Sequence, residues 1–293
     1  MIISCSRRTD VPAFYSEWFM NRIRAGFCEV QNPFRKDPVT TVSLKPEDVD
    51  VIVFWTRNPE PMIKHLKELD NRGYRYYFHY TIMNNPRLLD PGAPSMNIAI
   101  LTARQLADAI GADKLIWRYD PIVFGTGMDA TFHRNTYDHI TGALRRATHR
   151  SVISIVDVYR KVERRLRDLA EKGFELQSCD GEQLKDLMVS LVQIAKAGGM
   201  EVFSCAEEQD FTPYGIKPGK CVDDEYIRKV FGIEVSHKKD PSQRKACGCV
   251  ESRDIGAYST CLFGCQYCYA TNDFKRAKSA HTRHNPASPS LQP

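Results

Sequence analysis

The fold of this chain is limited most by six short apolar runs that alternate with amphipathic segments. The runs are MIISC (1–5), VIVFW (51–55), YRYYFHY (74–80), KLIWR (114–118), VISIV (152–156) and MEVFSC (200–205). Several are apolar almost throughout, as expected for parallel strands that are buried on both faces. Helical stripes predict helices near residues 14–25, 61–72, 97–110, 131–147, 159–172 and 184–197. Six β/α units predict an α/β fold built as a partial parallel (β/α)6 barrel, with an open doubly wound sheet as the alternative.

Composition divides the chain into three parts. Residues 1–205 are expected to form the partial barrel, and residues 206–275 a cysteine-rich segment that folds over its mouth. Residues 276–293 are rich in Ser, Pro and Ala without periodicity, which predicts a disordered tail. Residues 27–49 interrupt the alternation and are typical of an inserted loop or hairpin.

Polar residues follow each predicted strand at the point where it ends. The endings are SRRTD (6–10), TRN (56–58), HYT (79–81), RYDP (118–121), Asp157 with YRK (159–161), and CAEEQD (205–210). Ligands of parallel α/β proteins bind at the carboxyl ends of the strands. Six polar endings in succession therefore predict a polar pocket at this edge of the sheet.

Ten cysteines occur in a chain of 293 residues with 41 basic and 36 acidic residues, a net charge of +5. This surplus is too small to indicate a nucleic-acid partner. The sequence has no apolar run long enough to span a membrane, and its N-terminus does not resemble a signal peptide, so we expect a cytoplasmic protein without a membrane partner. Crowded cysteines in a reducing compartment indicate metal binding before disulfides.

Cys261, Cys265 and Cys268 lie in one short loop with the spacing C-x3-C-x2-C, and Gly264 permits a tight bend. Three thiolates on a [4Fe–4S] cube leave one iron without a protein ligand, and an open iron can bind a small molecule. A zinc knuckle, or a site completed by a distant cysteine, is the alternative.

Cys205, Cys221, Cys247 and Cys249 form a second set, in which the CGC sequence places two ligands close together. Four thiolates suit a fully ligated [4Fe–4S] cluster, which we favour, and they also suit structural zinc. Free thiols are the remaining alternative.

The first loop resembles the C-x3-C-x-aromatic-C motif of the radical S-adenosylmethionine enzymes, with Tyr267 in the aromatic position. The resemblance implies that S-adenosylmethionine chelates the open iron and that Tyr267 lies against its adenine. One electron would then cleave the cofactor to a 5′-deoxyadenosyl radical. In that family the motif ordinarily follows the first strand, where this chain has SRRTD. The resemblance therefore implies a permuted arrangement, in which the C-terminal segment returns to the barrel mouth.

Longer segments are similar to a bacterial family catalogued as domain of unknown function 1848. The similarity extends over roughly residues 1–272 and includes SRRTDVPAFYSEWFMNRIRAG, NPF, VIVFWTRNP, GYRYYFHYT, WRYDPI, CAEE, QRKACGCVESRDIGAYSTC and GCQYCYA. The family implies no established reaction or substrate.

Charged residues at the strand ends are the candidate catalytic residues, namely Arg7, Arg8, Asp10, Arg118 and Asp120. An arginine there could hold the carboxylate of S-adenosylmethionine or an anionic substrate, and Arg118 is also a candidate cofactor-binding residue. Arg–Asp pairs that only brace the loops are the alternative.

Two carboxylates, Asp157 and Glu207, are candidates for binding the ribose hydroxyls or the adenosyl amine, and Glu208 lies beside them. Solvated loop carboxylates are the alternative. His79 could transfer a proton or pack within its strand. Tyrosines that could stack on a ligand or simply pack are Tyr119, Tyr258 and Tyr269.

Together these features predict a radical S-adenosylmethionine enzyme that acts on an unidentified small-molecule, peptide or nucleotide substrate. Its electron donor would be a protein such as flavodoxin or ferredoxin. Its cofactors would be S-adenosylmethionine and a [4Fe–4S] cluster, with a second cluster or zinc at the other cysteine set. The alternative is a non-catalytic zinc or iron–sulfur protein that could contact nucleic acid.

Overall fold

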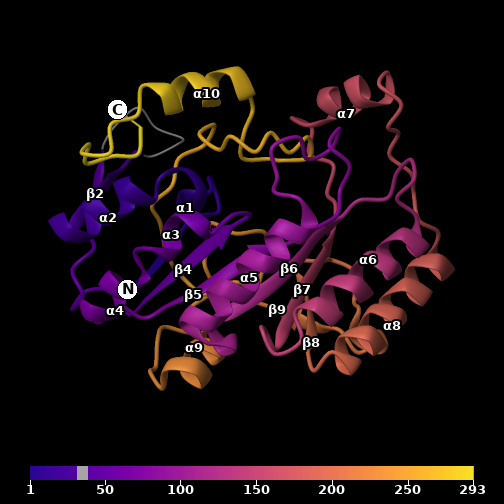
Figure 1. Cartoon of the computed structure of the whole chain (residues 1–293), viewed down its shortest axis with the longest axis horizontal. Coiled ribbons are helices and arrows are strands. Elements are labelled where there is room, and N and C mark those ends of the chain that lie inside the picture. Colours follow the sequence, from indigo (N-terminus) through magenta and orange to yellow (C-terminus); the bar gives the residue numbers. More distant parts are fainter. Residues whose placement is uncertain (32–38, 293) are drawn as a thin grey trace.

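A computed structural model of the chain describes residues 1–31 and 39–292. Its centre is an eight-stranded sheet in which all neighbouring strands are parallel, in the order β10-β1-β4-β5-β6-β7-β8-β9 (Figure 1). The strands are β1 (Ile2–Cys5), β4 (Val51–Thr56), β5 (Tyr76–Thr81), β6 (Leu115–Ile122), β7 (Arg150–Ile155), β8 (Glu201–Cys205), β9 (Lys217–Gly219) and β10 (Arg253–Asp254).

The six strands predicted from the apolar runs are all present, which confirms an α/β fold with a parallel sheet. The sheet is open: β10 and β9 are its edges, and the described strands show no barrel closure. Closing a parallel barrel usually takes eight strands of full length, whereas β10 and β9 have only two and three residues. Both edge strands come from the cysteine-rich segment, and β9 was not predicted.

The helices in the described residues are α1 (Val11–Phe14), α2 (Ser16–Ala25), α3 (Glu60–Ile63), α4 (Leu66–Asn71), α5 (Met96–Ile110), α6 (Ala130–Ala143), α7 (Glu163–Ala170), α8 (Gly181–Ala197), α9 (Asp224–Phe231) and α10 (Phe274–Thr282). Aspartate side chains cap the N-termini of several of these helices, among them α1, α6 and α8. Asp10, Asp129 and Asp180 each accept a hydrogen bond from the backbone N–H three residues further on. The helix expected near 61–72 is divided into α3 and α4.

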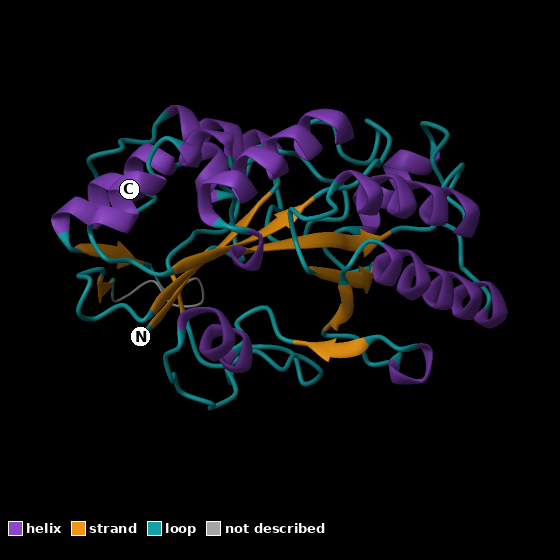
Figure 2. Cartoon of the chain, turned by 60° about the horizontal axis from the view of Figure 1, so that its bottom comes forward, coloured by secondary structure: helices purple, strands orange, loops and turns teal. Residues whose placement is uncertain are grey.

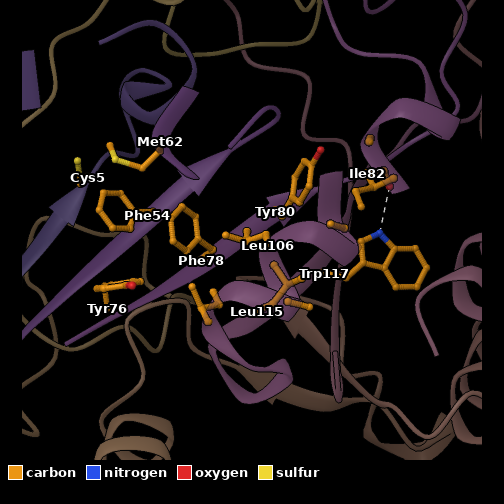
Figure 3. Packing of buried hydrophobic residues seen from close by; sticks show 14 of the residues in the cluster. Cys5, Phe54, Met62, Tyr76, Phe78, Tyr80, Ile82, Leu106, Leu115 and Trp117 are labelled. Carbon is orange, nitrogen blue, oxygen red and sulfur yellow. Dashed lines mark hydrogen bonds between the residues drawn. The ribbon is translucent and has the colours of Figure 1, made fainter. Parts of the chain in front are cut away.

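One face of the sheet packs against α1 to α6 and α8 in a large apolar core. Phe54, Phe78 and Trp117 enter this core from β4, β5 and β6 and are fully buried. Figure 3 shows the stacked rings of Phe54 and Phe78, whose centroids are 4.6 Å apart, and the hydrogen bond from Trp117 Nε1 to the Ile82 carbonyl at 3.1 Å. Each such buried aromatic contributes about 1.5–3 kcal/mol, so the core holds the strands, and hence their carboxyl ends, in place.

The opposite face of the sheet is covered by the cysteine-rich segment. Val53, Tyr77 and Ile116 point to this side and pack with residues of that segment and of α9. Figure 2 shows most helices gathered on one side of the sheet and loops with a short helix on the other. The segment therefore lies against the sheet face as well as contributing both edge strands.

The end of the chain differs from its prediction as a disordered tail. Residues 274–282 form α10, and the following residues return along α2. Trp18 Nε1 donates to the Ser288 carbonyl at 3.0 Å, and Arg22 Nη2 donates to the Ala287 carbonyl at 3.0 Å. Leu291 is buried in the main core. The polar composition concealed this order because backbone carbonyls, not apolar side chains, make most of the contacts.

The predicted insertion at 27–49 contains an antiparallel hairpin of β2 (Phe27–Val30) and β3 (Thr40–Ser43). The NPF sequence at 32–34 lies outside the described residues. Among the helices in 1–31 and 39–292, none is long and apolar enough to cross a membrane.

Candidate functional site: two groups of cysteines

The loop of residues 261–268, which carries Cys261, Cys265 and Cys268, lies at the carboxyl ends of β1 and β4. We call it the three-cysteine loop. The segments after these strands are joined by the backbone N–H of Arg57, which donates to Asp10 Oδ2 at 2.6 Å. Asp10 is also close enough to Cys261 to raise the pKa of that thiol. The loop is therefore placed where the sequence predicted a pocket.

Arg57, Asp90 and Tyr267 hold the loop through a buried ion pair. Arg57 Nη1 lies 2.8 Å from Asp90 Oδ2, and Arg57 Nη2 donates to the Tyr267 hydroxyl at 2.7 Å. The Tyr267 hydroxyl in turn donates to Asp90 Oδ2 at 3.0 Å. Its ring remains half-buried. Sequence reasoning noted Arg57 only as part of a polar strand end and missed Asp90, whose one signal was its place before the Pro91-Gly92 turn.

Backbone contacts fix the same loop on its other side. Gly92 N–H donates to the Phe263 carbonyl at 2.9 Å, and Gln266 N–H donates to the Leu89 carbonyl at 2.9 Å. A Cβ at Gly92 would lie only 2.7 Å from the Phe263 oxygen, so glycine is needed for this approach. Arg165, from α7, donates to the Thr271 carbonyl at 3.0 Å and to the Cys268 carbonyl at 2.5 Å. The loop thus bridges segments that follow β1, β4, β5 and β7.

Burial and nearby carboxylates raise the pKa of two thiols in this loop, Cys261 and Cys265. Burial, with Asp10 adding to it, raises the pKa of Cys261 to about 12. Burial and Asp90 raise the pKa of Cys265 well above its usual value, and Arg57 opposes this effect. Burial also raises the pKa of Asp10 to about 7, against hydrogen bonds from Arg57 and Ala13. Binding a metal centre here would release the thiol protons, as metal ligation of cysteine generally does.

Cys205, Cys221, Cys247 and Cys249 are brought together on the sheet face, and we call them the four-cysteine group. The Sγ atoms of Cys205 and Cys221 are 3.4 Å apart. Cys249 Sγ accepts hydrogen bonds from the backbone N–H of Cys221 at 3.2 Å and of Val222 at 3.4 Å. A hydrogen bond with Cys249 lowers the pKa of Cys247 to about 7. The described residues contain no group of three His, Cys, Asp or Glu side chains already spaced to hold a metal ion, and this applies to both groups of cysteines.

Arg118 lies beside the four-cysteine group. From β6, its Nη1 donates to Cys221 Sγ at 2.9 Å, while Nε donates to Asp120 Oδ2 at 2.8 Å. Asp120 also accepts from the Ser154 hydroxyl. Burial would lower the pKa of Arg118, but Asp120, Cys221 and Cys205 raise it well above its usual value. The candidate pair Arg118 and Asp120 is therefore an ion pair directed at a cysteine.

Arg7 lies beside the same group from the other side. Its backbone N–H donates to Asp254 Oδ2 at 2.8 Å, and its guanidinium lies over the Trp55 ring at 5.2 Å. Burial would lower the pKa of Arg7, whereas the charges of Cys249 and Cys221 raise it. Arg8 Nε instead lies 3.9 Å from Asp254 Oδ1, and Arg8 Cζ lies 5.3 Å from the centre of the Tyr258 ring. The two neighbouring arginines thus have different surroundings.

Asp157 and Glu207 line one small polar hollow of about 170 Å³, together with Glu208, Gln209 and Arg244. Asp157 forms an ion pair with Arg244. Glu207 accepts a hydrogen bond from the Ile155 N–H at 2.9 Å, and burial raises its pKa to about 7. Ala206 and Ala246, sequence neighbours of Cys205 and Cys247, complete the lining. A larger hollow of about 400 Å³ lies at α3 and α5 and includes no cysteine.

The remaining candidates are packing residues or lie near a cysteine group. His79 is fully buried, stacks on Trp55 at 5.3 Å and makes a hydrogen bond of 2.8 Å to the Cys221 carbonyl. Tyr119 makes a hydrogen bond of 2.8 Å to His133 inside the helix-side core, which is a packing role. The Tyr269 hydroxyl donates to the Arg7 carbonyl at 3.1 Å.

These features define an open parallel α/β protein with one set of cysteines at the carboxyl edge of its sheet and another against the sheet face. The sequence profile described as Domain of unknown function (DUF1848) matches residues 2–270, and the chain belongs to that family. No curated protein matches it.

Among solved structures, a protein from Bacteroides thetaiotaomicron VPI-5482 described as "a putative alpha-L-fucosidase" is 8% identical. The match covers 87% of this chain and 92% of that one, with a TM-score of 0.31. At this TM-score the likeness carries no argument about function.

Proposed function

We propose that this protein is a radical S-adenosylmethionine enzyme whose open-iron [4Fe–4S] cluster is held by Cys261, Cys265 and Cys268. The observation that supports this most is the position of the three-cysteine loop. It offers three thiols from one short segment at the carboxyl edge of a parallel sheet, where α/β proteins bind their ligands. When bound, such a cluster would supply one electron that breaks a sulfur–carbon bond of S-adenosylmethionine, releasing methionine and a 5′-deoxyadenosyl radical.

The late position of the loop in the sequence is compatible with this role. Tyr15, just after α1, donates from its hydroxyl to the Thr260 carbonyl at 2.8 Å, directly before Cys261. Asp10 lies near Cys261 from the same N-terminal segment. The C-terminal loop thus occupies space beside the end of β1, as a permuted arrangement requires. Under this proposal the open sheet, with its longer helices on one face, is an incomplete barrel.

The chain's own residues would orient and shield the cofactor. Arg57 and Asp90 fix the Tyr267 hydroxyl, so only the half-buried ring of Tyr267 is left to lie against adenine. Lys161 and Arg165 hold the carbonyls of Tyr269 and Cys268, which keeps the far end of the loop closed.

The four-cysteine group would hold an auxiliary centre, for which we favour a second [4Fe–4S] cluster over zinc. Arg7 Nη2 is buried and has no hydrogen bond of standard geometry within the described residues, although Cys249 lies near enough to interact weakly. Inorganic sulfides of a cluster are additional acceptors for such a donor, whereas a zinc ion adds none. A buried donor without an acceptor is costly, so the surroundings fit the cluster better.

An anaerobic reconstitution tests the proposal. The protein is loaded with iron and sulfide, reduced with dithionite, and mixed with S-adenosylmethionine, and 5′-deoxyadenosine is measured by chromatography. We expect about eight irons per chain, cleavage of the cofactor, and loss of cleavage in Cys265→Ala. Cys179→Ala, which changes a cysteine of neither group, is the matched control and should retain cleavage.

A protein that takes up only zinc, or that holds iron without cleaving S-adenosylmethionine, would contradict the proposal. Either result would favour the alternative of a non-catalytic metal-binding protein.

A further inference from the structure

The contact between Arg118 and Cys221 has the form of an outer-sphere interaction with a metal ligand. The guanidinium uses Nε and Nη2 for Asp120, and this leaves Nη1 free to donate to Cys221 Sγ at 2.9 Å. The Ser154 hydroxyl holds the other oxygen of Asp120. Asp120 holds two of the five N–H donors of the planar guanidinium and fixes its orientation, so the Ser154–Asp120–Arg118 chain directs Nη1 at the sulfur.

Arg7 follows β1 and lies beside the four-cysteine group, and its Nη2 is a donor without a partner among the described residues. Its Nη1 lies 3.3 Å from the Ser252 hydroxyl and 3.6 Å from Asp240 Oδ2. Its Nη2 is buried and, within the described residues, lacks a hydrogen bond of standard geometry. The aromatic ring of Trp55 shields the guanidinium from water. A buried Nη2 without an acceptor is costly, and an anionic centre beside it would supply one.

The charge of a loaded centre would supply that acceptor. Four thiolates around one divalent ion, or around a [4Fe–4S] core with two positive charges, carry a net charge of about −2. Such a charge is expensive to bury without compensation. Arg118 Nη1 already donates to Cys221 Sγ at 2.9 Å, and Arg7 Nη2 is buried with an unused donor. Their paired carboxylates hold them in place and leave donors directed at the sulfurs.

We propose that Arg118 and Arg7 are positioning residues of the four-cysteine group, which stabilise its metal-loaded form and favour its reduced state by donating to its sulfurs. The inference rests on the metal-binding part of the proposed function and not on cleavage of S-adenosylmethionine. It assigns Arg118 to the auxiliary centre instead of to the cofactor carboxylate.

The test uses Co²⁺ as the probe, in a full-length Cys265→Ala background so that the three-cysteine loop contributes little. Co²⁺–thiolate absorbance in competition with a chelator gives the dissociation constant. We expect Arg118→Gln to raise it about 10–100-fold, as loss of an outer-sphere partner generally does, and Arg7→Gln to act in the same direction. Arg104→Gln is the matched control, because that exposed arginine of α5 donates to the Ala143 carbonyl of α6, and it should leave the constant unchanged.

A second measurement separates positioning from general stability. After loading with iron and sulfide, the midpoint potential of the centre is measured by EPR in the same background. Removing a nearby cation disfavours the reduced state, so Arg118→Gln should shift the potential downward, and Arg118→Lys should restore most of the shift because it keeps the charge. If Arg118→Gln does not fold, Arg7→Gln provides both measurements.

Unchanged affinity and potential in folded Arg118→Gln and Arg7→Gln would overturn the inference alone. A parent that binds no Co²⁺ would overturn the auxiliary centre and this inference together. Neither result depends on S-adenosylmethionine cleavage, so failure of the proposed reaction is observed separately.

Discussion

The two groups of cysteines differ in how the chain assembles them. The three-cysteine loop is local in sequence and is held from outside by backbone contacts and by the Arg57–Asp90 pair. The four-cysteine group joins residues from β8, the turn after β9 and the segment before β10, and its thiols contact one another. In the four-cysteine group Cys221, Cys247 and Cys249 are buried and Cys205 is partly exposed, whereas in the loop Cys265 alone is buried. Under the proposed function, the three-cysteine loop suits a metal centre that binds a ligand, and the four-cysteine group suits a metal centre shielded from solvent.

The two groups also differ in their nearby charges. Beside the loop, Arg57 directs its Nη atoms to Asp90 and to the Tyr267 hydroxyl. At the four-cysteine group, Arg118 donates directly to a sulfur. This difference agrees with an exchangeable site at the edge of the sheet and a closed one on its face. The predictions below perturb one group and leave the other as an internal reference.

The largest expected effect comes from removing Arg57. Arg57→Met leaves Asp90 buried without its cation, which costs about 3–5 kcal/mol of unfolding free energy. Urea denaturation of the metal-free protein measures this loss, and hydrogen exchange at residues 259–270 should increase. Co²⁺ binding by the four-cysteine group should persist in the folded fraction.

Arg24→Met is the control for Arg57, because its ion pair with Glu68 is exposed and should contribute less than about 1 kcal/mol. The double variant Arg57→Met/Asp90→Asn should recover much of the lost stability, since no buried charge remains. If Arg57→Met costs no more than Arg24→Met, the buried pair does not hold the loop.

A smaller effect is expected at Gly92. In Gly92→Ala the new methyl group would lie 2.7 Å from the Phe263 carbonyl oxygen, so the loop must shift, at a cost of about 1–3 kcal/mol. Urea denaturation checks the cost, and iron content should fall at the three-cysteine loop only. Gly142→Ala in α6 is the matched control: nothing lies within 4 Å of its added Cβ, and helix propensity should stabilise it by up to about 1 kcal/mol. Equal effects of the two substitutions would rule out the close approach.

The smallest effect is a pH dependence of the C-terminal tail. Burial lowers the pKa of His281 and of His284, whose rings pack against Tyr15 at 5.3 and 4.9 Å. The folded state therefore binds fewer protons than the unfolded state, so this stability is present above pH ~6.5 and is lost as the pH falls below it. The Tyr15 hydroxyl also donates to the Thr260 carbonyl, so the protection of residues 259–262 from hydrogen exchange, relative to the intrinsic rate at each pH, should fall from pH 7.5 to 5.5.

The double variant His281→Gln/His284→Gln should remove that pH dependence, while exchange around Cys221 and Cys249 stays unchanged. If exchange around Cys221 and Cys249 changed with pH as much as exchange at 259–262, the tail would not act on the three-cysteine loop alone.

The strands and the cysteine sets could be predicted because their signals are local. An apolar run such as VIVFW, which is buried on both faces, can be recognised within a few residues, and so can the C-x3-C-x2-C spacing. The edge strand β9 could not be predicted, since a strand of three residues has no readable period. The order of the tail depends on carbonyl contacts with Trp18 and Arg22, which leave no mark in its own composition.

The sequence predicted many residues of the candidate site, but not which of them contact one another. Arg7, Arg118 and Asp120 were identified as polar strand ends, but only the fold shows that Arg118 faces Cys221. Asp90 was missed because its partner Arg57 comes from another strand end. Pairings of this kind join residues far apart in sequence, so no spacing rule reports them.

The central claim, that the two cysteine groups hold centres of different kinds, is tested most directly by EPR of the reduced, iron-loaded protein with and without S-adenosylmethionine. We predict two signals in the unaltered protein, of which one changes when S-adenosylmethionine is added. Cys265→Ala should lose that signal and keep one that does not respond. A protein whose signals all ignore S-adenosylmethionine, or a Cys265→Ala protein whose remaining signal responds to it, would contradict the account.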